Sequence, residues 1–370
     1  MTRESTLKRT PLYAVHQAAG AKLVDFSGWE MPLQYQRAAD EVKAVRTAAG
    51  LTDVSHLGRI EVRGPRAKEF LDVVTSNDVA ALKTGQAHYS FVLNPDGGIL
   101  DDIVIYRAEP LLYIVCCNAS NSEKLARWFG KHGGDASFVE DVTARDALIA
   151  LQGPSSFLIL QTFVDFDLKK LALYHIRRTT IMGEKTWLAR TGYTGERGYE
   201  IWMPGPKAAE LWDSLMEAGE FNGLVPAGLS ARDLLRLEMG FPLYGHELNE
   251  RTTPVEAGLL RGVSFKKGEF VGRSALEAQT AAAPSRVLVG FEMLSVEQGI
   301  PREGYSIHSN GSTIGEVTSG NISPTLRKPI GMGYVAAKYS KPGMEVWIDI
   351  RGKAGLANIV TMPFYKKVNR

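Results

Sequence analysis

A strand, a tight turn and a helix follow one another twice in this chain, and this pattern limits the folds open to it. Residues 58–62 alternate like a half-buried strand, Gly64-Pro65 turns the chain, and residues 66–74 have helical apolar spacing. The same order returns 89 residues later around Gly153-Pro154, and proline suits the first helical turn. Two such units predict an α+β body with sheets covered by helices on one side. A chance recurrence of Gly-Pro at helix starts is the alternative.

Length and charge exclude several classes of protein. The chain has 370 residues, which at about 150 residues per domain predicts two or three domains. It has 43 Lys and Arg against 41 Asp and Glu, a balance that argues against a nucleic-acid binder. No apolar stretch approaches the roughly 18 residues of a membrane span, and the N-terminus lacks a signal-peptide core. We therefore expect neither a nucleic-acid nor a membrane partner.

The two cysteines indicate a reducing compartment. Cys116 and Cys117 are adjacent in an apolar run, and neighbours on a strand point to opposite faces, so they cannot easily pair. They are expected to be small core residues of a cytoplasmic protein. Because no CxxC or HExxH spacing occurs and the seven His are scattered, no metal site is expected.

The second half of the chain changes character near residue 285. Helices are predicted at 121–130, 206–219 and 230–239 from their caps and apolar stripes. A small-residue stretch at 278–285 is a candidate linker. After it come strands and turns, with a hairpin turn at Ser309-Asn310-Gly311, so the last 85 residues are predicted to form a small β-barrel or sandwich.

A pair of acids opens the predicted strand that follows the turn Pro95-Asp96-Gly97-Gly98. Acids are depleted from strands, and Asp101 and Asp102 must point to opposite faces. If Asp101 points to solvent, Asp102 lies on the inner face with Val104 and Tyr106, where a carboxylate needs a partner or a chemical role. A carboxylate that only caps loop amides is the alternative.

A second polar segment, residues 190–200, has a glycine at every third position. This spacing is neither the dinucleotide GxGxxG nor a Walker sequence, so phosphate binding is a poor explanation. The turn is expected to present Tyr193 as a stacking or hydrogen-bonding ring and to place Glu200 at the start of a strand. A carboxylate there can accept two parallel N–H bonds from an amidine-like edge such as that of a pterin. A plain glycine-rich hairpin is the alternative.

Seven motifs together give the chain a family resemblance. The motifs are Arg9-Thr10-Pro11-Leu12-Tyr13, residues 25–33, Asp53-Val54-Ser55-His56-Leu57-Gly58, residues 97–102, residues 190–200, Ala231-Arg232-Asp233 with Arg236-Leu237-Glu238, and Thr253-Pro254-Val255-Glu256. From residue 9 to the final Pro363-Phe364-Tyr365, the chain resembles the T-protein of the glycine cleavage system, an aminomethyltransferase family.

The resemblance implies a fold and a reaction. The fold is α+β, a folate-binding body of two α/β subdomains over residues 1–277, with roughly 52–140 inserted, and a C-terminal β-barrel over 286–370. The reaction takes the aminomethyl group from the dihydrolipoyl arm of the H-protein, transfers its one-carbon unit to tetrahydrofolate, and releases ammonia and 5,10-methylenetetrahydrofolate. Tetrahydrofolate is then a co-substrate and the H-protein the partner.

The resemblance also implies roles for single residues. Asp102 is the expected catalytic carboxylate. The expected folate or substrate residues are Leu57, Tyr89, Asn118, Tyr193, Glu200, Arg232 and Tyr365. Leu57 stands where relatives often have Met, a change that roughly conserves volume.

Two other functions remain open from the sequence. The same scaffold could demethylate a small methylated donor with folate and no carrier protein. It could also be a folate-binding factor for iron–sulfur assembly that has lost transfer chemistry. Those assembly relatives rely on a Lys-Gly-Cys-type motif, and here both cysteines lie at Cys116-Cys117.

Overall fold

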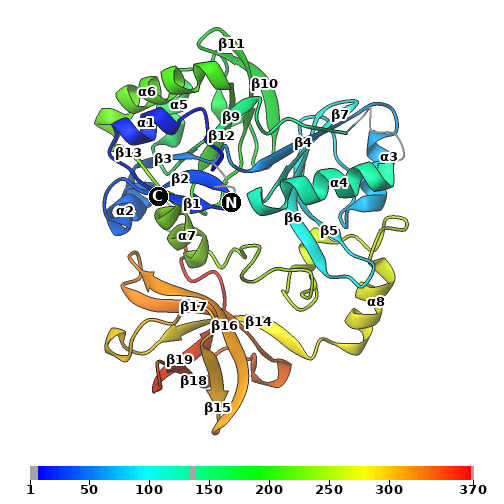
Figure 1. Ribbon diagram of the computed structural model, residues 1–370, viewed down its shortest axis with the longest axis vertical. Helices are drawn as coiled ribbons and strands as arrows, with labels where there is room; N and C mark the ends of the chain where they lie inside the picture. Colours follow the sequence, from blue (N-terminus) through cyan, green and yellow to red (C-terminus); the bar gives the residue numbers. More distant parts are fainter. Residues whose placement is uncertain (1–6, 134–138, 368–370) are drawn as a thin grey trace, which may run out of the picture. The chain divides into compact units, whose positions relative to one another are not determined.

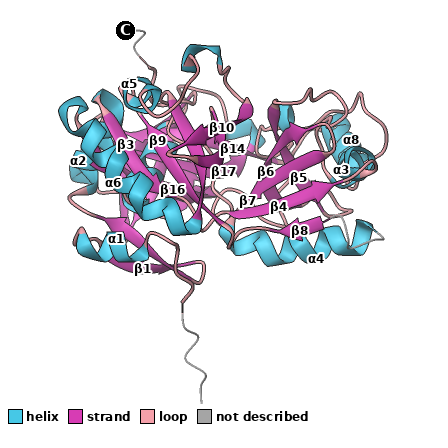
Figure 2. Ribbon diagram, turned by 90° about the horizontal axis from the view of Figure 1, so that it is seen from above, coloured by secondary structure: helices cyan, strands magenta, loops and turns pink. Residues whose placement is uncertain are grey.

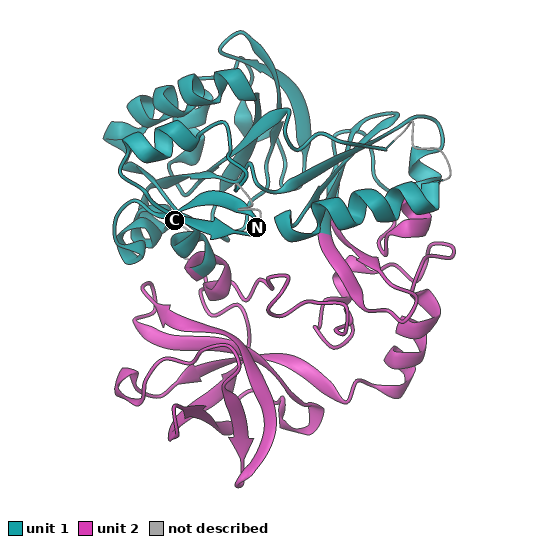
Figure 3. Ribbon diagram, in the orientation of Figure 1, with its two compact units in different colours: residues 1–70, 81–88, 103–233 teal, residues 71–80, 89–102, 234–370 magenta. Residues whose placement is uncertain are grey.

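The computed structural model describes residues 7–133 and 139–367, which fall into two compact units (Figure 3). Unit 1 consists of residues 1–70, 81–88 and 103–233, and unit 2 of residues 71–80, 89–102 and 234–370. Four elements contain a boundary between the units: α3 (Ala67–Val74), β5 (Ala87–Leu93), β6 (Ile99–Glu109) and α7 (Leu229–Glu238).

The remaining α-helices and strands, most of which are labelled in Figure 1, each lie within one unit. Those of unit 1 are α1 (Tyr13–Ala18), β1 (Lys22–Phe26), β2 (Trp29–Gln34), α2 (Ala38–Thr47), β3 (Ala49–Asp53), β4 (Gly58–Arg63), β7 (Leu112–Cys117), α4 (Ser122–Gly133), β8 (Val139–Asp141), β9 (Asp146–Gln152), α5 (Ser156–Gln161), β10 (Ile176–Ile181), β11 (Glu184–Ala189), β12 (Gly198–Pro204), α6 (Ala208–Gly219) and β13 (Leu224–Pro226). Those of unit 2 are α8 (Arg273–Ala282), β14 (Arg286–Met293), β15 (Ser306–Ser309), β16 (Ser312–Ser323), β17 (Lys328–Ala336), β18 (Glu345–Ile350) and β19 (Lys353–Val360).

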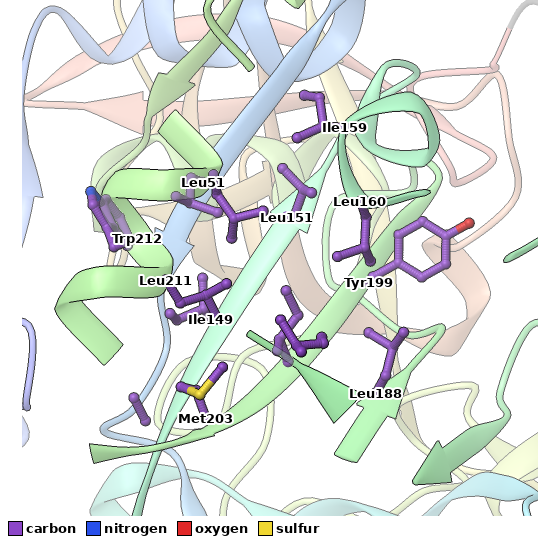
Figure 4. Packing of buried hydrophobic residues seen from close by; sticks show 14 of the residues in the cluster. Leu51, Ile149, Leu151, Ile159, Leu160, Leu188, Tyr199, Met203, Leu211 and Trp212 are labelled. Atoms are coloured by element: carbon purple, nitrogen blue, oxygen red, sulfur yellow. The ribbon is translucent and has the colours of Figure 1, made fainter. Parts of the chain in front are cut away.

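A six-stranded sheet with the order β10-β11-β12-β9-β3-β13 forms the centre of unit 1. Its strands are antiparallel except for the β13–β3 pair. Helices α2, α5 and α6 pack against it (Figure 2). Leu211 and Trp212 of α6 meet Ile149 and Leu151 of β9 in this core (Figure 4). The stripe predicted for α6 is therefore its buried face.

The other face of this sheet packs on a second sheet, whose order is β5-β6-β7-β4-β8. Leu148 and Ala150 of β9 lie in one cluster with Tyr106 of β6 and Ile114 of β7. Odd residues of β9 thus face the helices and even residues face the second sheet, as the period of two in a strand requires. Because both faces are covered, β9 is apolar along almost its whole length.

The C-terminal part of unit 2 is a closed barrel with the strand order β14-β17-β16-β15-β18-β19. Its core holds alternate residues of these strands, among them Phe291, Val317 and Ile348. The predicted hairpin turn joins β15 to β16, and Asn310 and Gly311 have φ of 49° and 77°. Positive φ at both central residues is the geometry that matches the twist of paired strands.

The fold class predicted from the sequence is confirmed: mixed helices and sheets with a C-terminal barrel. The candidate linker at 278–285 is helical over most of its length. Helix α8 continues to Ala282, and the break comes at Ala283 with φ of 60°. Alanine is the best helix former, so its small side chain was a misleading linker signal. None of the helices in the described part of the chain is long and apolar enough to cross a membrane.

Candidate functional site

The two acids at the start of β6 have different surroundings. Asp101 is completely buried, whereas Asp102 is partly exposed and accepts a hydrogen bond of 2.9 Å from the hydroxyl of Tyr89. The solvent-facing orientation considered for Asp101 is therefore wrong. Leu100 and Asp101 are both buried, so both faces of the strand are covered here, which a two-residue period does not reveal. The partner predicted for Asp102 is present.

The turn before β6 fixes where this strand begins. The side-chain Oδ1 of Asn94 accepts hydrogen bonds from the backbone N–H groups of Asp96 and Gly98, at 3.0 and 2.9 Å. A Cβ on Gly98 would lie only 2.0 Å from the carbonyl oxygen of Glu250. Only glycine fits there, and the turn thereby sets the position of Asp102 four residues later.

Glu200 lies on β12, as predicted, and is largely buried. Its Oε2 accepts hydrogen bonds from Thr191 Oγ1 and, at 3.3 Å, from the hydroxyl of Tyr106. Burial and the nearby Glu200 raise the pKa of Tyr106 well above its ordinary value, so Tyr106 remains a donor. Among the residues that the structure describes, none donates a hydrogen bond to Oε1 of Glu200.

Arg232 and Tyr193 stack on one another, although they lie 39 residues apart in the sequence. The guanidinium carbon of Arg232 lies 4.7 Å from the ring centroid of Tyr193, within the range of a cation–π interaction. Burial lowers the pKa of Arg232, while Tyr193 and Glu200 act in the opposite direction. The guanidinium combines a flat donor edge with an aromatic wall and a nearby carboxylate.

Gln152, which the sequence did not single out, holds the glycine-rich turn. Its side chain is buried and donates to the carbonyl oxygens of Thr191 and Tyr199, at 3.1 and 3.4 Å, and accepts from Thr194 Oγ1 at 3.1 Å. A Cβ on Gly192 or Gly198 would lie about 2 Å from this amide. The glycine spacing thus signalled a close approach, but nothing in the sequence identified the side chain that approaches.

The loop that carries Leu57 is held by a buried guanidinium. Arg59 donates to the carbonyl oxygens of Ser55, Leu57 and Asp146, at 2.8, 2.6 and 2.6 Å. Leu57 is half-buried and packs against the cluster between the two sheets. Next to it, His56 is 2% exposed, and burial together with Arg232 lowers its pKa to about 3, so its imidazole is neutral.

The other two predicted residues take part in local contacts. Asn118 directly follows β7, and its carbonyl oxygen accepts from the N–H of Asn121 in a 3₁₀ turn. Tyr365 donates its backbone N–H to the carbonyl oxygen of Glu238 at 2.8 Å. Its neighbour Phe364 packs with Leu237 of α7, which ties the tail to the end of that helix.

The predicted site residues are divided between the units. Within unit 1 the structure brings Tyr193 and Arg232 together near Glu200, and within unit 2 it joins Tyr89 to Asp102. In the described ranges, no three His, Cys, Asp or Glu side chains gather as they would to hold a metal ion. Unit 1 holds Leu57, Asn118, Tyr193, Glu200 and Arg232, and unit 2 holds Tyr89, Asp102 and Tyr365.

Comparison with known proteins gives matches along nearly the whole chain. The family model of the GCVT N-terminal domain matches residues 12–267, and that of the glycine cleavage T-protein C-terminal barrel domain matches residues 286–366. An aminomethyltransferase of Halothermothrix orenii is 45% identical over 97% of this chain and 100% of its own length. One of Chloroherpeton thalassium is 46% identical over 98% of this chain and 99% of its own length.

A solved structure agrees with these matches. The crystal structure of glycine cleavage system aminomethyltransferase T from Bartonella henselae superposes with a TM-score of 0.90 at 35% sequence identity, covering 98% of this chain and 99% of that one. The agreement in sequence and fold extends over both family domains. The chain therefore belongs to the glycine cleavage T-protein family of aminomethyltransferases.

Proposed function

We propose that this aminomethyltransferase transfers the one-carbon unit of the aminomethyl group on the dihydrolipoyl arm of an H-protein to tetrahydrofolate. The transferred carbon loses its bonds to sulfur and nitrogen and gains bonds to two folate nitrogens. The two folate N–H protons leave on the thiol and on ammonia, so the products are dihydrolipoyl H-protein, ammonia and 5,10-methylenetetrahydrofolate. The observation that carries the proposal is the 45–46% identity to aminomethyltransferases over nearly the whole chain, together with the Tyr89–Asp102 pair.

Asp102 is the proposed catalytic residue. A partly buried carboxylate can stabilise the positive charge that develops on the transferred carbon and its nitrogen, orient the folate amine and accept its proton. The hydroxyl of Tyr89 donates to Oδ2 and restricts how the carboxylate turns. Fixed geometry between two bound partners can supply several kcal/mol of the barrier reduction, which gives Tyr89 a role in placing the pterin.

The folate is proposed to be held by the binding residues that the family resemblance implies. Glu200 offers Oε1 to the amidine-like edge of the pterin, because Oε2 is already engaged by Thr191 and Tyr106. Arg232 donates to an acceptor edge while stacked on Tyr193. The proposed remaining contacts are the apolar side chain of Leu57, the amide of Asn118 and the ring of Tyr365.

Asp102→Asn tests the chemistry. The change keeps the shape and the bond from Tyr89 but removes the charge, so kcat for tetrahydrofolate-dependent ammonia release should fall by about 10²–10⁴-fold. The dissociation constant for tetrahydrofolate should stay within about threefold. Unchanged turnover would remove Asp102 from the mechanism.

Glu200→Gln is the matched variant for binding. It should raise the dissociation constant for tetrahydrofolate about tenfold or more, because a hydrogen bond to a charged carboxylate is replaced by a hydrogen bond to a neutral amide. An unchanged dissociation constant would contradict the assignment of Glu200.

The same assays separate the other functions of this scaffold. Release of ammonia only with aminomethyl-loaded H-protein supports the proposal. Turnover of free methylated amines or sulfonium compounds without the carrier would indicate a demethylase. Folate binding with no transfer from either donor would indicate an assembly factor.

We also propose the domain limits 1–277 and 286–370, with roughly 52–140 inserted in the first. The ranges of the two family models and the five-stranded sheet built from strands between Gly58 and Asp141 support these limits. Two free cysteines, Cys116 and Cys117, support a reducing, cytoplasmic location.

A further inference from the structure

Lys267 of unit 2 is an unusual lysine, because its ammonium group is buried against backbone carbonyls. Its side chain is 2% exposed, and lysine is seldom buried without partners. Nζ lies 2.5 Å from the carbonyl oxygen of Asp72, 2.6 Å from that of Thr75 and 2.8 Å from that of Asn77. The three N–H donors of an ammonium therefore match three acceptors. The nearest carboxylate oxygen, Oδ1 of Asp72, is farther away at 3.4 Å.

These carbonyls belong to the C-terminal end of α3 and the turn after it. The last carbonyls of a helix have no partner inside the helix and favour a nearby cation. Lys267 supplies that cation from a segment almost 200 residues later. The segment is itself anchored, because Arg273 at the start of α8 donates to the carbonyl oxygens of Lys267 and Gly268, at 2.7 and 2.9 Å.

From this turn, a short series of hydrogen bonds leads to Tyr89. The side chain of Asn77 donates through Nδ2 to the carbonyl oxygen of Tyr89 at 2.8 Å. The backbone N–H of Asn77 donates to Ser90 Oγ at 3.0 Å, and that of Ser76 donates to the carbonyl oxygen of Phe91 at 2.9 Å. The turn thus binds β5 along three consecutive residues, the first of which is Tyr89.

The segment before Lys267 also contacts the ring of Tyr89. Ser76 Oγ donates to the carbonyl oxygen of Gly262 at 2.7 Å. A Cβ on Gly262 would lie 2.6 Å from Phe91 and 3.2 Å from Cδ1 of Tyr89. The backbone of Tyr89 is therefore held by Asn77, and the backbone at Gly262 passes close to its ring.

We propose that Lys267 is a positioning residue for the Tyr89–Asp102 pair. Its ammonium group holds residues 72–77 in the conformation in which Asn77 binds the backbone of Tyr89, and the hydroxyl of Tyr89 then meets Asp102. The effect on turnover rests on the function proposed above, whereas the effect on the geometry of β5 does not.

The charge of Lys267 is sensitive to pH. Burial lowers its pKa to about 8, and the carboxylates of Asp72 and Asp78 act in the opposite direction. The ring of Phe270 also lies near the ammonium group, with its centroid 5.0 Å from Nζ. The guanidinium of Arg273 binds the backbone carbonyl oxygen of Lys267 itself. A neutral amine has only two hydrogens for three carbonyls. The hold on the turn therefore weakens as the pH rises above about 8.

Lys267→Met tests the proposal, with Lys266→Met as the control because Lys266 is the exposed neighbour. A displacement of about 1 Å at reacting groups can cost 10²-fold, so Lys267→Met should lower kcat by about 10–100-fold. The dissociation constant for tetrahydrofolate should stay within about threefold. In the free protein, the amides of residues 89–91 should exchange hydrogen faster. Lys266→Met should match the wild type in all three measurements.

The pH profile separates positioning from a purely structural effect. The ratio of kcat between wild type and Lys267→Met should be constant at low pH and decline above about pH 8. A ratio that does not change with pH would contradict the role of the ammonium charge.

The proposal can still be decided if Lys267→Met fails to fold or if the wild type shows no transfer activity. If Lys267→Met does not fold, Asn77→Ala breaks the same series at its bond to Tyr89 and should give the same loss of kcat. A folded Lys267→Met with kcat within twofold of wild type and unchanged exchange at 89–91 overturns the proposal. If the wild type itself transfers nothing, the proposed function has failed, and the exchange measurement alone then decides the role of Lys267.

Discussion

The contact between Gln152 and the glycine-rich turn allows a quantitative test by paired substitution. In Gly192→Ala, the new Cβ would lie 2.0 Å from Oε1 of Gln152, where an ordinary contact needs about 3.4 Å. The amide must therefore withdraw by more than about 1 Å, which breaks its three hydrogen bonds. At about 1 kcal/mol each, their loss lowers the free energy of unfolding by about 3 kcal/mol. Backbone strain adds nothing, because φ of Gly192 is not positive.

A double-mutant cycle isolates this contact. Gln152→Ala removes the same hydrogen bonds and should also cost about 3 kcal/mol. It also removes the obstacle, so Gly192→Ala added to it should cost almost nothing more. The double variant should be as stable as Gln152→Ala alone, which corresponds to a coupling energy of about 3 kcal/mol.

Urea unfolding followed by tryptophan fluorescence measures these differences from the shift of the midpoint at constant slope. Gly130→Ala is the control, because Gly130 lies in α4 with no atom within 4 Å of its added Cβ. It should be neutral or stabilise by about 0.5–1 kcal/mol. Additive single effects, or a Gly192→Ala variant within 1 kcal/mol of wild type, would refute the reasoning.

Three other predictions concern buried ionisable side chains. Arg236→Met should lower the free energy of unfolding in urea by about 3–5 kcal/mol, because it leaves Glu247, whose Oε2 lies 2.9 Å from Arg236 Nη1, as an unpaired buried charge. The double variant Arg236→Met with Glu247→Gln should recover part of that loss. If it recovers none, the ion pair is not the cause. Burial acts to raise the pKa of Asp53, but its hydrogen bonds with His16, Ser55 and Thr10 and its electrostatic interaction with His16 outweigh burial and hold the pKa below its usual value of 3.8. The stabilisation by Asp53 is therefore complete above about pH 4 and is lost as the pH falls further. The free energy of unfolding of Asp53→Asn should consequently fall less than that of the wild type on acidification. If the two proteins lose stability in parallel as the pH falls, this prediction is wrong. His56, with its pKa lowered to about 3, should show no change in its imidazole NMR shifts between about pH 5 and 8, and a midpoint near 6.5 would disprove its neutral, buried state.

Elements whose signals are local could be predicted from the sequence. The Gly-Pro pairs mark the starts of α3 and α5, and the Asn310-Gly311 pair marks the hairpin between β15 and β16. In each case the backbone conformation depends on one or two residues that have few other choices. Asp102 could be singled out for the same reason, because an acid within a strand needs a compensating partner.

Features that depend on tertiary packing could not be predicted. The orientation of Asp101 depends on other parts of the fold that cover its face of the strand. The length of α8 depends on whether its alanine-rich sequence packs, through Leu276, against the rest of unit 2. Gln152 and Lys267 look like ordinary surface residues in the sequence. Their roles come from carbonyl groups that lie about 40–200 residues away along the chain.

Two loops beside proposed site residues are held by the same physical device, a buried cation bound to backbone carbonyls. Arg59 donates hydrogen bonds to the backbone carbonyl oxygens around Leu57, and Lys267 donates to those of the turn that binds Tyr89. A carbonyl is a fixed dipole, so such a cation specifies loop geometry with little dependence on carboxylate partners. Buried interactions are also screened far less by salt than exposed ion pairs such as Lys8–Glu123. Because removal of the cation leaves several converging carbonyls without donors, the loops next to the site depend on single residues that no local sequence pattern identifies.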